Sequence, residues 1–262
     1  MKLMFLLLAG WCAINASFTL ALTPEEKGLD IARKMEKANA GFMGEVAEMT
    51  MTLIDAYGTE IVRKMEGKIK EISDDGDKSI ITFLQPSDVK GTKMLTWGHK
   101  TENDDQWLYL PSMKRVKRIS SNSKTSSFMG SEFSYEDLGG QSVEKFTYKH
   151  LRDEKSELGN VWVIERYPVN VKESGYLKQV MWIPEKYHAS SKVEYYDRKG
   201  TLVKTADFLD YQSFPVAGKN IFRPAKIHMK NVQTKKQSIF SWDKRKIGEN
   251  LLNNHFSQDS LK

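Results

Sequence analysis

The most informative stretch of this sequence reads Asp105-Gln-Trp-Leu-Tyr-Leu-Pro-Ser-Met-Lys-Arg-Val-Lys-Arg-Ile119 and continues, after a polar lead-in, as Ser126-Ser-Phe-Met-Gly-Ser-Glu-Phe-Ser-Tyr-Glu-Asp-Leu138. It joins an aromatic strand, a basic run and an apolar loop that contains a glycine. None of the nucleophile, metal-ligand or phosphate-binding signatures of an enzyme occurs in it. The stretch therefore points away from a catalytic centre.

Several predicted strands, this one included, are apolar on both faces. They are Trp107 to Leu110, Ile80 to Leu84, Val161 to Ile164 and Met181 to Ile183. Because an antiparallel sheet with one solvated face alternates apolar and polar residues, something must cover each face here. Two arrangements satisfy this condition. One is a two-sheet sandwich or a sheet packed on helices, and the other is a curved sheet with helices on one side and a bound apolar ligand on the other.

The remaining pattern predicts one helix followed by many strands. Thr23 is a suitable N-cap, Pro24 takes the first helical position, Glu26 completes a capping box, and the helical spacing ends at Gly41. The strands that follow, separated by turn signals at regular spacing, favour one antiparallel barrel or sandwich. A short helix is expected from Glu249 to Phe256. Strands are expected at about 46–53, 61–70, 79–85, 91–97, 105–110, 114–119, 145–152, 160–168, 176–183, 191–197, 201–210, 221–231 and 236–243.

Residues 1–21 have the pattern of a secretory signal peptide, with a positive Lys2, an apolar run and the small-x-small site Thr19-Leu-Ala21. A retained N-terminal anchor is the alternative. Trp11 stands where a lipoprotein signal needs a small residue before Cys12, which argues against lipidation. Residues 22–262 are expected to form a single domain without disulfides, since Cys12 is the only cysteine.

The charge pattern disfavours nucleic acid as a partner. The formal net charge is +6, and acidic residues are scattered among the basic ones. The run Lys114, Arg115, Lys117 and Arg118 has two interpretations: a solvated strand flank, or a patch that meets phosphate head groups or an acidic partner.

The loop around Met129 also has two interpretations. Phe128, Met129, Phe133 and Tyr135 either form a lid over a cavity mouth or pack inward as a core plug. Together with Trp107 and Tyr109 they are the candidate ligand-binding residues.

Motifs typical of enzyme active sites and metal sites are scarce in the sequence. There is no Gly-x-Ser-x-Gly, and the histidines are widely scattered without a His-Glu-x-x-His pair. A carboxylate pair drawn from Glu132, Glu136 and Asp137 stays open, because such pairs form in space. We expect no enzyme activity, no metal and no cofactor.

Motifs spread over the chain resemble a known family. They are Phe83-Leu-Gln-Pro-Ser-Asp88, Gly91-Thr-Lys-Met-Leu95, Trp107-Leu-Tyr-Leu-Pro111, Phe128-Met-Gly-Ser131, Phe133-Ser-Tyr-Glu-Asp-Leu138 and Val193-Glu-Tyr-Tyr-Asp197. In these segments the chain is similar to the outer-membrane lipoprotein-sorting proteins of the LolA/LolB-like carrier superfamily. The resemblance implies a curved, incomplete antiparallel β-barrel, closed by helices around an apolar cavity. It also implies non-covalent carriage of acyl chains, with an inner-membrane transporter of the resistance-nodulation-division (RND) type as donor.

Together with the signal-peptide pattern, the resemblance thus implies a monomeric periplasmic carrier from a Gram-negative bacterium. It would bind acyl chains of lipoproteins or lipids, touch the membrane surface transiently and move cargo between the inner and outer membranes. The alternatives are a periplasmic sensor or protein-interaction module that uses the same sheet, and an enzyme acting on lipid or glycan.

Overall fold

The computed structural model describes residues 21–262. Of the predicted signal peptide, only Ala21 falls within this range. The helix α1 (Pro24–Asn39) begins with the predicted capping box: Thr23 Oγ1 accepts a hydrogen bond from Glu26 N at 3.2 Å, and the Glu26 carboxylate accepts one from Thr23 N at 2.8 Å. None of the helices in the described range is long and apolar enough to cross a membrane.

The strands form a single antiparallel sheet in which every neighbouring pair is consecutive in sequence, except β1 with β13. This open sheet, with β6 and β7 at its two ends, confirms the predicted curved, incomplete barrel and not a two-sheet sandwich. The strands are β1 (Gly44–Ile54), β2 (Glu60–Lys70), β3 (Lys78–Gln85), β4 (Lys93–Trp97), β5 (Asp105–Leu110), β6 (Arg115–Arg118), β7 (Phe146–Ser156), β8 (Gly159–Pro168), β9 (Tyr176–Pro184), β10 (Lys192–Asp197), β11 (Leu202–Val216), β12 (Lys219–Asn231) and β13 (Gln237–Ile247).

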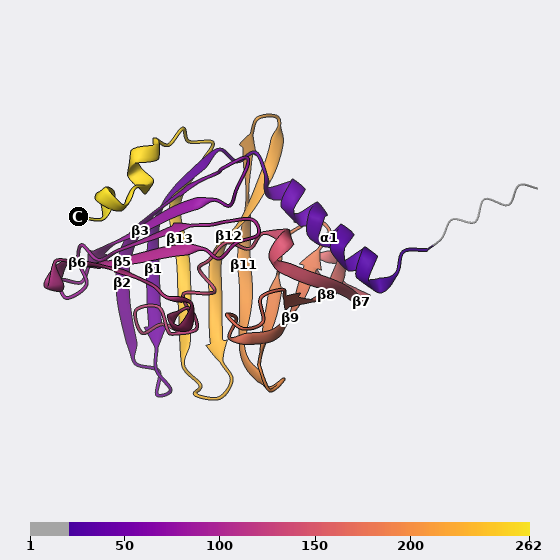
Figure 1. Cartoon of the computed structure of the whole chain (residues 1–262). Coiled ribbons are helices and arrows are strands. Elements are labelled where there is room, and N and C mark those ends of the chain that lie inside the picture. The colour runs from indigo at the N-terminus through magenta and orange to yellow at the C-terminus, as the bar shows by residue number, and fades with distance from the viewer. Residues whose placement is uncertain (1–20) are drawn as a thin grey trace, which may run out of the picture.

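Two segments cover the sheet. Figure 1 shows α1 lying across the end that carries β7 and β8, while the C-terminal segment lies across the opposite end. The α1 helix lies close to β7, since a Cβ added to Gly28 would come within 2.8 Å of the Lys149 backbone nitrogen. The predicted helix at 249–256 is instead a pair of 3₁₀ turns, η4 (Asn253–Phe256) and η5 (Gln258–Leu261). Three further 3₁₀ turns are η1 (Pro111–Met113), η2 (Ser121–Ser123) and η3 (Val143–Lys145).

The inner face of the sheet carries the main core. Residues from α1, from most strands and from the 126–138 segment meet there, including Ile31, Met51, Phe83 and Phe128, all at most 1 % exposed. The residues of one strand that point to this face are every second one. Leu108 is among them, whereas its neighbour Trp107 is not.

The outer face of β3, β4 and β5 carries a second cluster, which we call the outer cluster. Ile80, Leu95 and Trp107 are cross-strand neighbours, and the C-terminal residues Phe256 and Leu261 pack against them. Trp97 Nε1 donates to the Phe256 carbonyl at 2.7 Å. The expectation that both faces of these strands are covered is therefore confirmed, with the chain's own C-terminal segment covering the outer one.

Candidate ligand-binding cavity

An apolar cavity of about 180 Å³ opens on the inner face of the sheet, between the strands around β1 and the 126–138 segment. Its wall is mostly aliphatic and aromatic. The apolar residues that line it from the inner face and the plug side are Ala47, Met49, Gly67, Ile69, Ile81, Met94, Phe133, Leu138, Ile227, Phe240 and Trp242.

Two small residues leave room for this cavity. Ala47 on β1 and Gly67 on β2 are register partners, so neither strand projects a large side chain at this point. A Cβ on Gly67 would come within 2.5 Å of Met49 Sδ, which shows how closely that flexible side chain lies over the glycine. Neither position stands out in the sequence, where Ala and Gly simply continue the strand pattern, and our sequence reasoning did not identify them.

The charged groups that line the cavity already have partners. The Glu45 carboxylate forms ion pairs with Arg223 Nε at 3.1 Å and Arg245 Nε at 2.8 Å. Asp137 pairs with Lys204 at 2.5 Å, and both side chains are less than one-tenth exposed. Because paired charges have little demand for further polar contacts, the cavity offers a ligand mainly apolar surface.

Residues 126–138, here called the plug segment, fold into a tight hairpin. Ser127 and Ser134 form an isolated β-bridge, and Phe128 N donates to the Phe133 carbonyl at 2.7 Å. The turn is made by Met129 and Gly130, whose φ angles of 51° and 78° lie in the left-handed region. This region is readily accessible to glycine, which explains why Gly130 follows the bulky residues here.

The plug segment points its aromatic side chains inward. Phe128, Phe133 and Tyr135 are each at most 8 % exposed, and Met129 is partly buried. Phe133 lies 4.5 Å from Phe240 between ring centroids and lines the cavity, whereas Phe128 packs on Phe83 at 5.8 Å. Of the two interpretations of this loop, the structure shows the inward-packed one.

A buried polar network holds the base of the plug segment. Asp137 accepts hydrogen bonds from Ser134 N at 2.6 Å and from Tyr176 Oη at 2.9 Å, in addition to its ion pair with Lys204. Burial, reinforced by the Asp137 carboxylate, raises the pKa of Tyr176 well above its ordinary 10, so its hydroxyl remains a donor. The Lys204 ammonium also lies 5.2 Å from the ring centroids of both Tyr176 and Tyr195.

The structure does not bring all the predicted ligand-binding residues together. Trp107 and Tyr109 belong to the outer cluster, on the face of β5 away from the cavity, because alternate residues of a strand point to opposite faces. Phe128, Phe133 and Tyr135 lie in the main core, with Met129 packed against it.

The basic run lies on the edge strand β6 and on the turn before it. Lys114, Arg115, Lys117 and Arg118 are all exposed, and Arg118 forms an ion pair with Asp105. Charged side chains on an edge strand discourage pairing with another sheet, which is sufficient to explain their position.

The three carboxylates considered for catalysis bind separate partners. Glu132 accepts from Asn231 Nδ2 at 2.8 Å, Glu136 from Gly175 N at 2.9 Å, and Asp137 belongs to the plug network. Within residues 21–262, no three His, Cys, Asp or Glu side chains gather closely enough to hold a metal ion.

Comparison with known proteins identifies the family. A family model described as "-like: Uncharacterized protein" matches residues 75–262. A domain described as an outer membrane lipoprotein-sorting protein domain, from Vibrio parahaemolyticus, is 42 % identical, covers 90 % of this chain and 99 % of its own, and superposes with a TM-score of 0.86. A DUF1329 family protein from Desulfovibrio piger is 27 % identical, with coverages of 92 % and 100 % and a TM-score of 0.86.

A LolA superfamily protein from Nitrosomonas europaea shares the fold, with a TM-score of 0.69 at 18 % identity over 92 % of this chain and 100 % of its own. None of the curated proteins compared matches the chain. The identity and coverage of the Vibrio domain place this chain in the outer-membrane lipoprotein-sorting protein family, and the likeness to the Nitrosomonas protein shows that it has the LolA fold.

Proposed function

We propose that this protein is a carrier that binds acyl chains of lipids or lipoproteins non-covalently in the apolar cavity. The observation that carries the proposal is the cavity itself: its wall is largely aliphatic and aromatic, and its charged groups are already paired. Such a site favours the binding of an apolar ligand. Its lining residues do not form the arrangement of nucleophile and base, or of metal ligands, that a catalytic site needs.

The size of the cavity indicates how the cargo would be held. At about 180 Å³ it resembles engineered cavities of about 150 Å³ that hold a benzene molecule, and it is smaller than most ligand pockets, which begin at about 300 Å³. The cavity would therefore take the end of an acyl chain, and a longer chain would enter only if the plug segment moved. Each methylene buried contributes about 0.8 kcal/mol. Burying a long chain therefore releases enough free energy to offset the cost of moving the plug segment.

The remaining parts of the proposal concern the cellular setting. A carrier of this kind would work in the periplasm, with residues 22–262 as its mature domain. It would act as a monomer, receive cargo from an RND-type transporter and touch the membrane surface transiently. The exposed basic residues of β6 support contact with anionic head groups, because each basic side chain near an anionic membrane contributes about 1 kcal/mol.

The first experiment is uptake of a fluorescent fatty acid by detergent-free protein, with native mass spectrometry and lipid extraction of the same sample. We expect the wild-type protein to bind, and Ala47→Leu to weaken binding about tenfold, because the added methylenes occupy cavity volume. Val46→Leu is the matched control, since Val46 packs in the outer cluster on the opposite face of β1. A wild-type protein that carries no lipid and takes up no fatty acid would contradict the carrier proposal.

One observation favours a second candidate, a protein-interaction module. The plug segment fills much of the concave side with the chain's own aromatic side chains. If lipid does not bind but a periplasmic partner does, and lipid leaves that binding unchanged, this second function replaces the first.

A further inference from the structure

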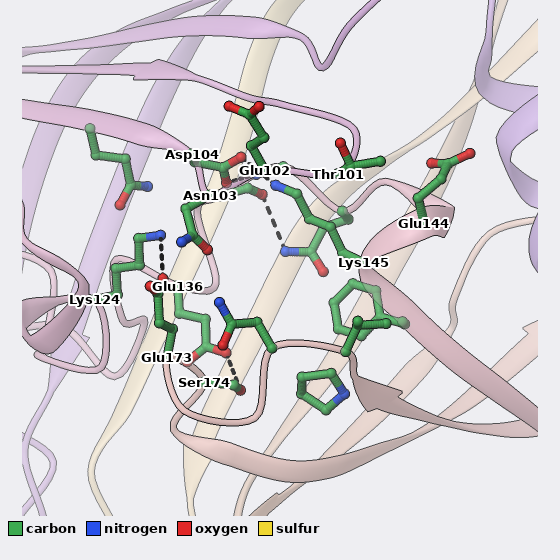
Figure 2. A pocket seen from close by; sticks show the side chains of 18 of the residues that line it. Thr101, Glu102, Asn103, Asp104, Lys124, Glu136, Glu144, Lys145, Glu173 and Ser174 are labelled. Carbon is green, nitrogen blue, oxygen red and sulfur yellow. Dashed lines mark hydrogen bonds and ion pairs between the residues drawn. The ribbon is translucent and has the colours of Figure 1, made fainter.

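A second hollow, which we call the polar cleft, lies on the other side of the plug segment and has a volume of about 130 Å³. It is formed by the β4–β5 turn (101–104), by residues 135–146 and by the β8–β9 connection (168–174). Figure 2 shows Glu102 and Asp104 on one side of this hollow and Glu136 and Ser174 on the other. The proposed carrier function does not use it.

The polar cleft carries an excess of negative charge. Its lining contains the carboxylates of Glu102, Asp104, Glu136, Glu144 and Glu173, against the ammonium groups of Lys124 and Lys145. Lys145 forms an ion pair with Asp104, and Lys124 lies 3.6 Å from Glu173.

One further cation lies behind the wall. Arg166 donates to Gln141 Oε1 at 2.5 Å and stacks on Phe146 at 4.0 Å, and both partners line the cleft. Five carboxylates against these three cations still leave an excess of two negative charges. Glu102 and Glu144 are exposed at the rim, and neither forms an ion pair with any residue in the described range.

A buried acceptor in the wall has no donor. Gln106 lines the polar cleft and is 1 % exposed. Its Nε2 donates to the Tyr135 carbonyl at 2.9 Å, while its Oε1 receives no hydrogen bond from residues 21–262. A buried acceptor without a donor is unfavourable, so the site gains when a bound group supplies one. This observation is independent of the carboxylates: the Gln106 acceptor calls for a hydrogen-bond donor, and the excess of carboxylates favours a donor that is positively charged.

The polar cleft and the apolar cavity are neighbours. Gln106 of the cleft and Thr96 of the cavity are directly paired across β4 and β5, so their Cβ atoms are about 5 Å apart. The plug segment is a shared wall, because Phe133 lines the cavity and Tyr135 lines the cleft. A molecule with an apolar chain and a polar head would find a complementary surface on each side of this wall.

We propose that the polar cleft is a head-group subsite for a primary ammonium group, belonging to an amphiphile whose chain occupies the apolar cavity. This inference rests on the proposed carrier function, which it deepens by naming the chemistry of the head. It does not follow from the net charge of the chain, which is +6 and would favour an anionic head group through its long-range field.

The test compares three probes with the same chain, dodecylamine, dodecyltrimethylammonium and dodecanoate, by isothermal titration calorimetry near neutral pH. We expect dodecylamine to bind about tenfold more tightly than both others, because it alone carries positive charge together with N–H donors. Equal binding of the amine and the trimethylammonium probe would overturn the role of the Gln106 acceptor. Equal binding of all three would overturn the subsite and leave the carrier function intact, whereas no binding of any probe would reject the carrier function itself.

Two double variants, and ethylamine as an amine without a long alkyl chain, test where the preference for dodecylamine arises. The double variant Glu102→Gln, Glu144→Gln should lose most of the preference for dodecylamine, while Glu60→Gln, Glu157→Gln makes the same change in net charge at exposed sites elsewhere and should keep it. Ethylamine distinguishes a lipid head group from a free amine. We expect it not to compete at millimolar concentration, and competition would overturn the assignment to an amphiphile.

Discussion

The buried ion pair between Asp137 and Lys204 joins the plug segment to β11. Both side chains are less than one-tenth exposed. Lys204→Ala would leave Asp137 buried without its counter-ion, and removing one partner of such a pair costs about 3–5 kcal/mol. We therefore expect a loss of this size in the free energy of unfolding, measured by urea denaturation.

The control for this prediction is Lys230→Ala. Lys230 pairs with Asp207 at 2.9 Å on the same sheet, but the two side chains are 45 % and 30 % exposed, so the loss should stay below about 1 kcal/mol. Similar losses for the two variants would show that burial of the Asp137–Lys204 pair does not stabilise the plug segment.

The pair formed by His99 and Asp75 predicts that the free energy of unfolding depends on pH. His99 Nδ1 lies 2.6 Å from Asp75 Oδ2. Burial lowers the pKa of His99, but hydrogen bonds and charges from Asp75 and Asp105 outweigh it and raise that pKa above its ordinary 6.5. The hydrogen bond with His99 lowers the pKa of Asp75 to about 2. A raised histidine pKa stabilises the folded state below its ordinary value, and this contribution is lost as the pH rises through the raised value.

The variant His99→Gln tests this sign. We expect the wild type to exceed the variant in free energy of unfolding by the largest margin near about pH 5, where Asp75 is still ionised and His99 is charged. The margin should shrink toward about pH 9. A margin that is constant or grows over this range would contradict the assignment.

At the scale of the elements, the C-terminal segment separates the stability of the fold from ligand binding, because it packs on the face of the sheet opposite the cavity. Phe256 is 1 % exposed and packs in the outer cluster, away from the cavity. Phe256→Ala should therefore cost about 3–5 kcal/mol in stability while leaving the affinity for a fatty acid unchanged. Leu252→Ala, at a residue that is 60 % exposed, is the control and should change neither. A loss of fatty-acid affinity in folded Phe256→Ala would show that the two faces are coupled.

These elements also show how far sequence reasoning extends. The capping box at Thr23 and the strands apolar on both faces were predicted correctly, because both depend on local spacing. The prediction that Trp107 and Phe133 line the same site was not supported, because they belong to different clusters. The alternation of residues along a strand separates its two faces, but it does not show which face lies inside.

The groups that shape the cavity are non-local and could not be found in this way. Asp137 and Lys204 are 67 residues apart, and nothing in either neighbourhood indicates that they meet. Ala47 and Gly67 open the cavity only because β1 and β2 pair in one particular register. Such contacts are set by the fold, so the residues that line the cavity could be predicted from the sequence less well than the architecture.

The open sheet and its plug together determine how much cargo the molecule can hold. In Figure 1 the open sheet curves around its concave side. The cavity on that side is lined by residues of the sheet and of the plug segment. Phe133 is the large plug side chain that faces this space, with its ring 4.5 Å from Phe240. Truncating the Phe133 side chain would add the volume of its ring to the cavity.

We therefore expect Phe133→Ala to bind long-chain fatty acids more tightly than the wild type, despite a loss of about 3–5 kcal/mol in stability. Affinity should rise with chain length in the variant beyond the length at which it levels off in the wild type, because each further methylene buried adds about 0.8 kcal/mol. Phe128→Ala is the matched control: Phe128 is fully buried against Phe83 but does not line the cavity, so it should lose stability without gaining affinity. Titration of a series of fatty acids against the three proteins measures both effects. If the two variants bind every chain alike, the plug segment does not set the capacity of the cavity.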